Sequence, residues 1–173
     1  DTQQQWNRQS LKLPAKMAFG AAITTNDGVI LIGGRNHDHA LNSVMRLEWH
    51  PDSEQVVLET YPPLPHPLAH CAAALLDDRI YVAGGKNHIT GIATTQYFYA
   101  LDLKQKGSPD FAWQPMSHWP GAPRVDPVVA VQSNGETDCL YLFGGKNRST
   151  LLQDGFEYNP DQNSWKSLSE TPN

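Results

Sequence analysis

A basic residue followed by asparagine occurs three times in this chain, each time directly after a pair of glycines. The three pairs are Arg35-Asn36, Lys86-Asn87 and Lys146-Asn147. If the three loops meet, their cations form a ring suited to a carboxylate ligand, which a guanidinium can bind through two parallel hydrogen bonds. The alternative for each pair is turn chemistry, with asparagine accepting an unusual backbone conformation and the cation in solvent.

A second group of polar residues precedes the apolar stretch that opens each later repeat: His66 and His70 in one case, Arg124 and Asp126 in the other. For Arg124 a structural role, bonding backbone carbonyls between repeats, is an equal alternative to ligand binding. The predicted substrate-binding set is Arg35, Lys86, Asn87, Lys146, Asn147, His70 and Arg124.

The sequence contains none of the familiar catalytic motifs. It has no Gly-x-Ser-x-Gly, no phosphate-binding loop and no zinc-protease pattern. His37 and His39 share one loop but have no carboxylate or thiol partner at metal-ligand spacing, and His88 stands apart, so exposed loop positions are the better interpretation. We expect neither a metal nor a cofactor.

These candidate residues belong to an internal repeat of four apolar residues, two glycines, a basic residue and asparagine. The glycine pairs of the three copies are Gly33-Gly34, Gly84-Gly85 and Gly144-Gly145. Such self-similarity indicates a repeat architecture. The glycines would end a strand where the backbone bends sharply or passes close to a neighbour.

Each repeat predicts four short antiparallel strands. In the first, a small apolar stretch (18–25) is joined through Asn26-Asp27-Gly28 to Val29–Ile32, and strands over 43–49 and 56–61 follow. The whole chain, 1–173, is then one domain with repeats over 15–61, 62–116 and 117–168. A leading strand over 6–14 precedes them.

Composition narrows the range of partners. The net charge is −5 and the basic residues are scattered, so we expect neither nucleic acid nor an anionic membrane as partner. No apolar run approaches the ~18 residues of a membrane span.

Cys71 and Cys139 are interpreted as two ordinary buried thiols. The chain opens at Asp1 without an initiator methionine, which favours a trimmed, exported or periplasmic protein.

The third repeat resembles the kelch repeat, because Gly144-Gly145 is followed by Tyr158 and, seven residues later, Trp165. In the first repeat Trp49 and Val56 hold these two places. The resemblance implies an all-β, kelch-type β-propeller with three four-stranded blades. Propellers close with about 4–8 blades, so three blades leave two faces uncovered. We therefore expect half of a six-bladed ring, completed by further blades or by a second copy in a homodimer.

The second and third repeats are similar to the N-acetylneuraminate epimerase (sialic acid mutarotase) family. The similarity is carried by Tyr99 to Leu103, by Trp113, and by Trp119-Pro120-Gly121-Ala122-Pro123-Arg124-Val125-Asp126. The first repeat resembles that family's last blade, which implies a circularly permuted order.

The resemblance implies an isomerase that interconverts anomers of N-acetylneuraminate, a small acidic sugar, by general acid–base ring opening. That family places a glutamate just after the double glycine of one blade, where this chain has Arg35, Lys86 and Lys146. The catalytic group is therefore left unassigned. The alternative is a non-catalytic kelch module that binds a glycan or a protein. A carbohydrate oxidase is a weaker alternative, because no copper ligands are evident.

Overall fold

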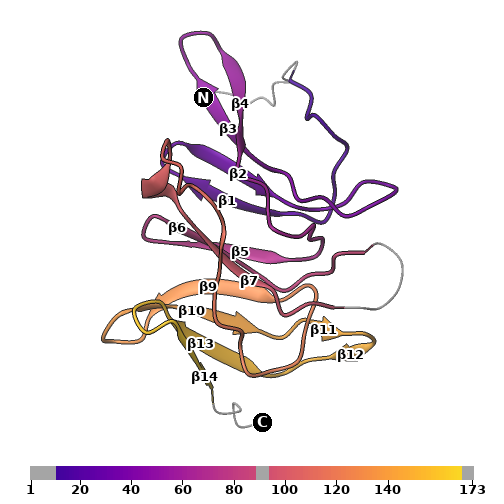
Figure 1. Cartoon of the computed structure of the whole chain (residues 1–173), viewed down its shortest axis with the longest axis vertical. Helices are drawn as coiled ribbons and strands as arrows, with labels where there is room; N and C mark the ends of the chain where they lie inside the picture. The colour runs from indigo at the N-terminus through magenta and orange to yellow at the C-terminus, as the bar shows by residue number, and fades with distance from the viewer. Residues whose placement is uncertain (1–10, 89–93, 169–173) are drawn as a thin grey trace, which may run out of the picture.

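The computed structural model describes residues 11–88 and 94–168, which form three four-stranded antiparallel sheets (Figure 1). The described residues contain no α-helix, and one short 3-10 helix, η1, covers Leu103–Gln105. The prediction of an all-β fold built from three four-stranded blades is confirmed.

In each blade the strands lie side by side in chain order, with antiparallel pairing throughout. The first blade contains β1 (Ala21–Thr25), β2 (Gly28–Ile32), β3 (Val44–His50) and β4 (Gln55–Tyr61). The second contains β5 (Ala72–Leu76), β6 (Arg79–Ala83), β7 (Phe98–Asp102) and β8 (Gln114–Pro115). The third contains β9 (Val128–Ser133), β10 (Asp138–Phe143), β13 (Gly155–Asn159) and β14 (Ser164–Ser167).

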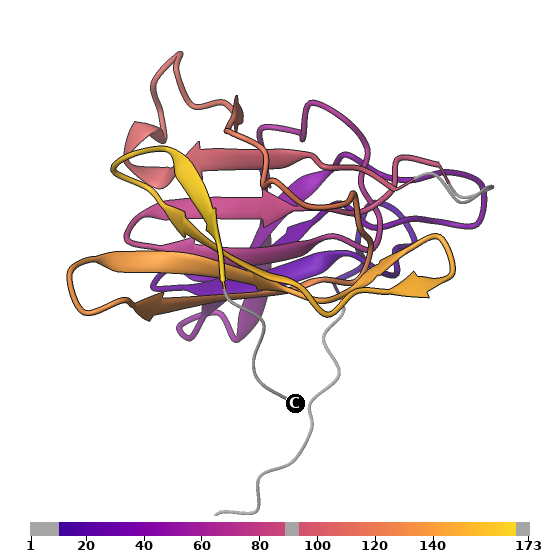
Figure 2. The same ribbon diagram turned by 90° about the horizontal axis from the view of Figure 1, so that it is seen from below.

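The first strands of the three blades are neighbours, since β5 contacts both β1 and β9. These are the innermost strands, as in a propeller, and the loops gather at the two ends of the strands (Figure 2). One end carries the hairpin turns between the first and second strands. The other end carries the double glycines and the segments that lead into each inner strand.

Apolar side chains between neighbouring blades form two cores. Ile30 and Ile32 of the first blade pack with Ile80, Val82 and Leu101 of the second, and all five are fully buried. Between the second and third blades the core is aromatic and includes Tyr81, Phe98, Trp119, Phe156 and Tyr158. Each such side chain contributes about 1.5–3 kcal/mol when it leaves water, so the blades are held mainly by these cores.

Two tryptophans join the outer edges of the blades. The indole Nε1 of Trp113 donates to the carbonyl of Pro62 at 2.8 Å, and that of Trp165 donates to the carbonyl of Ser117 at 2.7 Å. Both carbonyls lie just after the outer strand of the preceding blade. Each indole therefore satisfies its polar group while its ring fills the core.

The double glycines join the blades at the opposite, inner side. The amide of Gly34 donates to the carbonyl of Leu68 at 2.7 Å, and the amide of Gly85 donates to the carbonyl of Arg124 at 2.8 Å. Both acceptors lie in the segment that leads into the next blade. A Cβ on Gly84 would lie 2.7 Å from this same carbonyl oxygen of Arg124, and a Cβ on Gly85 (φ +98°) would lie 2.8 Å from the carbonyl oxygen of Ala69 in its own blade. Only glycine permits this approach.

The loop after Gly144-Gly145 contains a small hairpin, in which Lys146–Asn147 (β11) pairs with Thr150–Leu151 (β12). One expectation needs correction. In the first blade, Leu47 and Leu58 rather than Trp49 and Val56 occupy the places of Tyr158 and Trp165. Val29 and Leu140 are equivalent, because each stands four residues before its double glycine. Leu140 pairs with Tyr158, and Val29 pairs with Leu47, which pairs in turn with Leu58. The β3–β4 hairpin is longer, so Trp49 lies two residues nearer to its turn.

The predicted leading strand, 6–14, lies partly outside the described residues. Residues 11–14 are described and form no strand. The two outermost sheet faces carry large exposed apolar side chains: Val29 and Trp49 on the first blade, Val128 and Phe143 on the third. Completion of the ring by further blades or a second copy stays a prediction.

Both cysteines are free and buried. Burial raises the pKa of the Cys71 thiol to about 11, so it is neutral and unreactive at ordinary pH. The interpretation as two ordinary buried thiols is confirmed.

The tight approach at Gly85 predicts a large cost for adding one methyl group. In Gly85→Ala the new Cβ meets a backbone oxygen at positive φ, so we expect a loss of about 2–4 kcal/mol in the free energy of unfolding, measured by urea denaturation. Gly107→Ala is the matched control, because Gly107 has φ +86° and nothing within 4 Å of its Cβ position. It should lose only about 1–2 kcal/mol. Equal losses would show that backbone conformation alone matters.

Glu157 is a nearly buried carboxylate on the outer face of the third blade. It accepts hydrogen bonds from Lys166 Nζ at 2.9 Å, Asn134 Nδ2 at 3.1 Å and Tyr141 Oη at 3.2 Å. Burial raises the pKa of this carboxyl, but the hydrogen bonds and the nearby ammonium outweigh it, and the net pKa lies below the ordinary 4.5.

A lowered pKa in the folded state means that ionised Glu157 stabilises the fold above the pKa of the unfolded chain. This contribution is lost as the pH falls from about 4.5 through the folded-state pKa. We expect Glu157→Gln to flatten this acid-dependent decline in the thermal unfolding midpoint. Glu136→Gln, at an exposed turn position, is the control and should leave the decline unchanged. An unchanged slope in Glu157→Gln would contradict the assignment.

Candidate functional site

Three equivalent residues at the start of the inner strands have an unusual backbone conformation. Phe19, His70 and Asp126 have φ values of 58°, 60° and 52°, in the left-handed region that residues with a Cβ seldom adopt. The amide of His70 donates to the carbonyl of Phe19 at 2.8 Å, and the amide of Asp126 donates to the carbonyl of His70 at 2.9 Å. The three residues therefore form a row across three blades. Such strain is often found at functional sites.

The side chains of this row touch in sequence. The ring of His70 stacks on Phe19, with centroids 4.5 Å apart and an interplanar angle of 17°. On its other side, His70 Nδ1 lies 2.8 Å from Asp126 Oδ1. Lys146 Nζ approaches the second oxygen, Asp126 Oδ2, at 3.4 Å. We call Phe19, His70, Asp126 and Lys146 the channel-end array, because they lie at one end of the inner strands, which face the central channel in a closed propeller.

The three cations that follow the double glycines lie at equivalent positions. Arg35, Lys86 and Lys146 form isolated β-bridges with Ala18, Ala69 and Val125, the residues immediately before the row. Each blade therefore places one cation beside one member of the row. The structure brings His70 and Lys146 together through Asp126, and it places Arg35 beside Phe19 in a depression of about 340 Å³.

The three cations differ in how many hydrogen bonds and ion pairs their side chains already form. The guanidinium of Arg35 donates to the carbonyls of its own loop, from Nε to Asn36 at 3.0 Å and from Nη2 to His37 at 3.4 Å. Lys146 is half-exposed and paired with Asp126. The ammonium of Lys86 forms no hydrogen bond or ion pair with any residue in the described ranges 11–88 and 94–168.

The asparagines after these cations are used locally. Asn147 Oδ1 accepts from Thr94 Oγ1 at 3.0 Å, which joins the second and third blades. Asn36 Oδ1 accepts from the amides of Asp38 and His39, both at 2.8 Å, in a turn of the kind expected for asparagine. Asn87 is half-buried beside the residues that the structure does not describe.

Arg124 is completely buried and fully engaged in its own blade. Its Nε donates to Ala122 O at 3.1 Å and its Nη1 to Gly144 O at 2.9 Å, while Nη1 and Nη2 reach both carboxylate oxygens of Asp154 at 2.7 and 2.9 Å. The guanidinium also lies over the rings of Trp119 and Phe156. The role of Arg124 is therefore structural, as one alternative predicted, but the carbonyls it bonds belong to its own repeat and not to a neighbouring one. The buried guanidinium is inaccessible to a ligand.

Three further histidines, His37, His66 and His88, lie outside the array. His66 Nδ1 is 2.8 Å from Tyr99 Oη, and its ring stacks on Tyr97. Burial, and the nearby Tyr97, raise the pKa of Tyr99 to about 12, so this phenol is neutral. His37 and His88 are exposed loop residues. Within the described ranges no three His, Cys, Asp or Glu residues are grouped so as to hold a metal ion.

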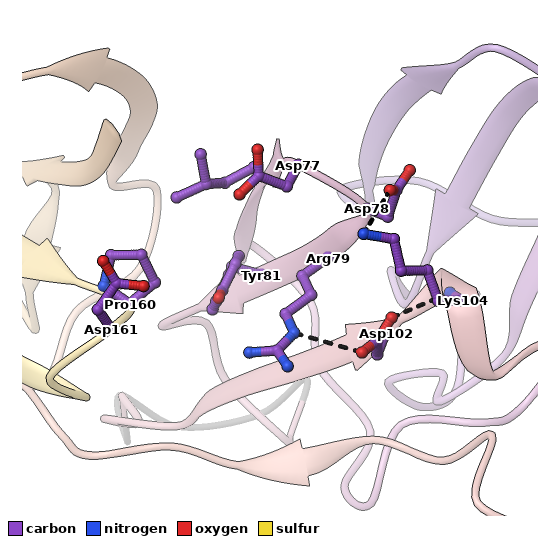
Figure 3. A pocket seen from close by; sticks show the side chains of 9 residues that line it. Asp77, Asp78, Arg79, Tyr81, Asp102, Lys104, Pro160 and Asp161 are labelled. Atoms are coloured by element: carbon purple, nitrogen blue, oxygen red, sulfur yellow. Dashed lines mark hydrogen bonds and ion pairs between the residues drawn. The ribbon is translucent and has the colours of Figure 1, made fainter. Parts of the chain in front are cut away.

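A polar pocket of about 290 Å³ lies at the other end of the strands, near the β5–β6 turn (Figure 3). Both of its cations are paired, since Arg79 Nε is 3.4 Å from Asp102 Oδ2 and Lys104 Nζ is 3.1 Å from Asp78 Oδ2. Asp77 and Asp161 also line the pocket, so it is acidic and offers no free cation to a sugar carboxylate. The channel-end array is the better candidate site.

The sequence predicted His70 and Lys146 as binding residues and Asp126 as a candidate, but it did not predict that Asp126 contacts both of them. Phe19 is not among the predicted binding residues. The repeat itself carried the signal, because Phe19, His70 and Asp126 each stand 14 to 18 positions before their double glycine. The left-handed backbone that aligns them was not foreseeable from residue type.

The fold and the loop arrangement define a kelch-type propeller, and comparisons agree. The chain is 28% identical over 122 residues to a kelch domain-containing protein of Vibrio cholerae, covering 67% of this chain and 30% of that protein. Within the described residues there is no helix long and apolar enough to cross a membrane.

Within the class of kelch-type propellers, the comparisons identify one family. A family model for N-acetylneuraminate epimerase matches residues 61–173, so the chain belongs to that family. It is 36% identical over 114 residues to N-acetylneuraminate epimerase of Pasteurella multocida, covering 63% of this chain and 26% of that protein. With the enzyme of Haemophilus influenzae strain PittEE the identity is 34% over 115 residues, covering 64% and 27%.

The chain therefore spans about a quarter of the length of these curated relatives. The family model covers the second and third blades and leaves the first blade outside its match. The circularly permuted order stays a prediction, as does the exported location.

The guanidinium of Arg124 donates hydrogen bonds to two carbonyls and both oxygens of Asp154. We therefore expect the stability of the fold to depend on the shape of this side chain as well as on its charge. A lysine cannot reach two carbonyls and both carboxylate oxygens at once, so Arg124→Lys should lower the free energy of unfolding by about 2 kcal/mol. This figure allows for the partial exposure of Asp154. Arg35→Lys is the control and should change it by under about 0.5 kcal/mol, because Arg35 bonds only its own loop. Urea denaturation measures both, and similar losses would refute the distinction.

Proposed function

We propose that this chain contributes to a mutarotase that interconverts the anomers of N-acetylneuraminate. Membership of the epimerase family supports this proposal, and the observation that carries it is the channel-end array. A stacked histidine, a carboxylate and nearby cations lie at one end of the inner strands. Ring opening needs proton transfer near neutral pH, and a cation orients the sugar carboxylate.

The chemistry required is modest. One group removes the proton of the anomeric hydroxyl while the ring carbon–oxygen bond breaks, and the ring oxygen gains a proton. The open-chain form then recloses on its other face. Such steps use residues with exchangeable protons and need no metal or cofactor.

A non-catalytic role is the alternative. It is favoured by one observation: positions 35, 86 and 146, where the family's glutamate would be sought, carry cations. In that case the same array binds an acidic glycan without accelerating anomer exchange.

The test is anomer exchange of N-acetylneuraminate followed by NMR at slightly acidic pH, with and without the folded chain. We expect the protein to accelerate exchange by at least about tenfold over buffer. Ligand-induced shifts of the His70 and Lys146 resonances are recorded in parallel, with uncharged N-acetylmannosamine as the control sugar. Shifts without acceleration would support the non-catalytic alternative. If the sugar caused no shifts and the protein no acceleration, both the mutarotase proposal and the non-catalytic alternative would be contradicted.

A further inference from the structure

The contact between His70 and Asp126 has the geometry of a proton-transfer pair. His70 Nδ1 lies 2.8 Å from Asp126 Oδ1, so in the neutral imidazole Nδ1 carries the hydrogen that is donated to the carboxylate. The lone pair then resides on Nε2. Nε2 makes no hydrogen bond with any residue of the described ranges.

Several contacts hold the imidazole in place. Its ring stacks on Phe19, and its side chain is only 18% exposed. The backbones of His70 and Asp126 share the left-handed conformation and are joined by the 2.9 Å bond from the Asp126 amide to the His70 carbonyl. The relative position of the two side chains is therefore set by two blades at once, which limits the loss of geometry through rotation.

Asp126 is itself partly neutralised. Its second oxygen, Oδ2, faces Lys146 Nζ at 3.4 Å. The lysine lowers the repulsion that a bare carboxylate would exert on an approaching sugar acid. A ligand carboxylate would then find the cation and the imidazole within one array.

His66 and His37 lack this combination. His66 Nδ1 contacts a tyrosine hydroxyl, which is both donor and acceptor and does not fix the tautomer. His37 pairs with Asp38, but its side chain is 98% exposed and held by no second element. His70 alone among these three has a carboxylate partner from another blade.

From this geometry we infer that His70 is the proton-transfer residue for anomer exchange and that Asp126 is the residue that positions it. The inference rests on the proposed function. His70 Nε2 accepts the proton of the anomeric hydroxyl, the carbonyl forms, and the bond between the anomeric carbon and the ring oxygen breaks. Water protonates that oxygen, and the imidazolium returns its proton to the resulting hydroxide, so protons balance and nothing is oxidised or reduced.

The variants are chosen to keep the backbone intact. Asparagine tolerates positive φ better than other residues with a Cβ, so His70→Asn and Asp126→Asn retain the left-handed row. Asp77→Asn is the matched control. Asp77 has φ 52°, as Asp126 does, but it lies in the β5–β6 turn at the other end of the blade.

Two readouts separate the roles. In the exchange assay His70→Asn should lose at least about 100-fold of the acceleration and Asp126→Asn about 10-fold, while Asp77→Asn matches wild type. In ¹⁵N NMR of the imidazole at slightly alkaline pH, wild type should show the hydrogen on Nδ1. Asp126→Asn should shift the population toward Nε2–H, because the amide can donate to Nδ1. A merely structural carboxylate would not move this equilibrium.

The failures are distinguishable. Acceleration by wild type that His70→Asn retains would overturn the role of His70 and leave the proposed function standing. An unchanged tautomer in Asp126→Asn would overturn the positioning role, whatever the rates. No acceleration by folded wild-type chain would overturn both the proposed function and this inference.

Discussion

The close approach of one blade's backbone to the next, at the double glycines, is the constraint on which the other inner contacts depend. The amides of Gly34 and Gly85 donate to carbonyls in the segment that leads into the following blade. A Cβ on the preceding glycine, Gly33 or Gly84, would collide with that same carbonyl oxygen, and a Cβ on Gly34 or Gly85 would lie 2.8 Å from a carbonyl oxygen of its own blade. Because the chain must pass there without side chains, the next residue emerges at a fixed place. That residue is Arg35, Lys86 or Lys146, bridged to the start of its own inner strand.

The same constraint aligns the row of Phe19, His70 and Asp126. Each residue follows a bridged position and turns through positive φ to enter its inner strand. The blades then repeat this geometry with different side chains, and three chemically distinct groups come into contact. Conformational strain that would be costly in an isolated loop is offset here by hydrogen bonds between blades.

The match to the N-acetylneuraminate epimerase family model spans residues 61–173. The matched region covers the second and third blades, which supply His70, Asp126 and Lys146, whereas Phe19 and Arg35 come from the first blade. Arg124 illustrates how a plausible ligand-binding residue can be structural. Its guanidinium replaces the hydrogen-bonding partners that its blade would otherwise lack and is closed off by two aromatic rings.

The sequence by itself determined the repeat, the four strands of each blade and the place of the glycines, because hydrophobic periodicity and turn residues act locally. It also determined that cations follow each glycine pair. Tertiary structure alone decided that His70 meets Asp126 across 56 residues and that Arg124, paired with Asp154, is buried. Those outcomes depend on contacts between segments far apart in the chain, and residue spacing along the chain does not encode the distance between such side chains.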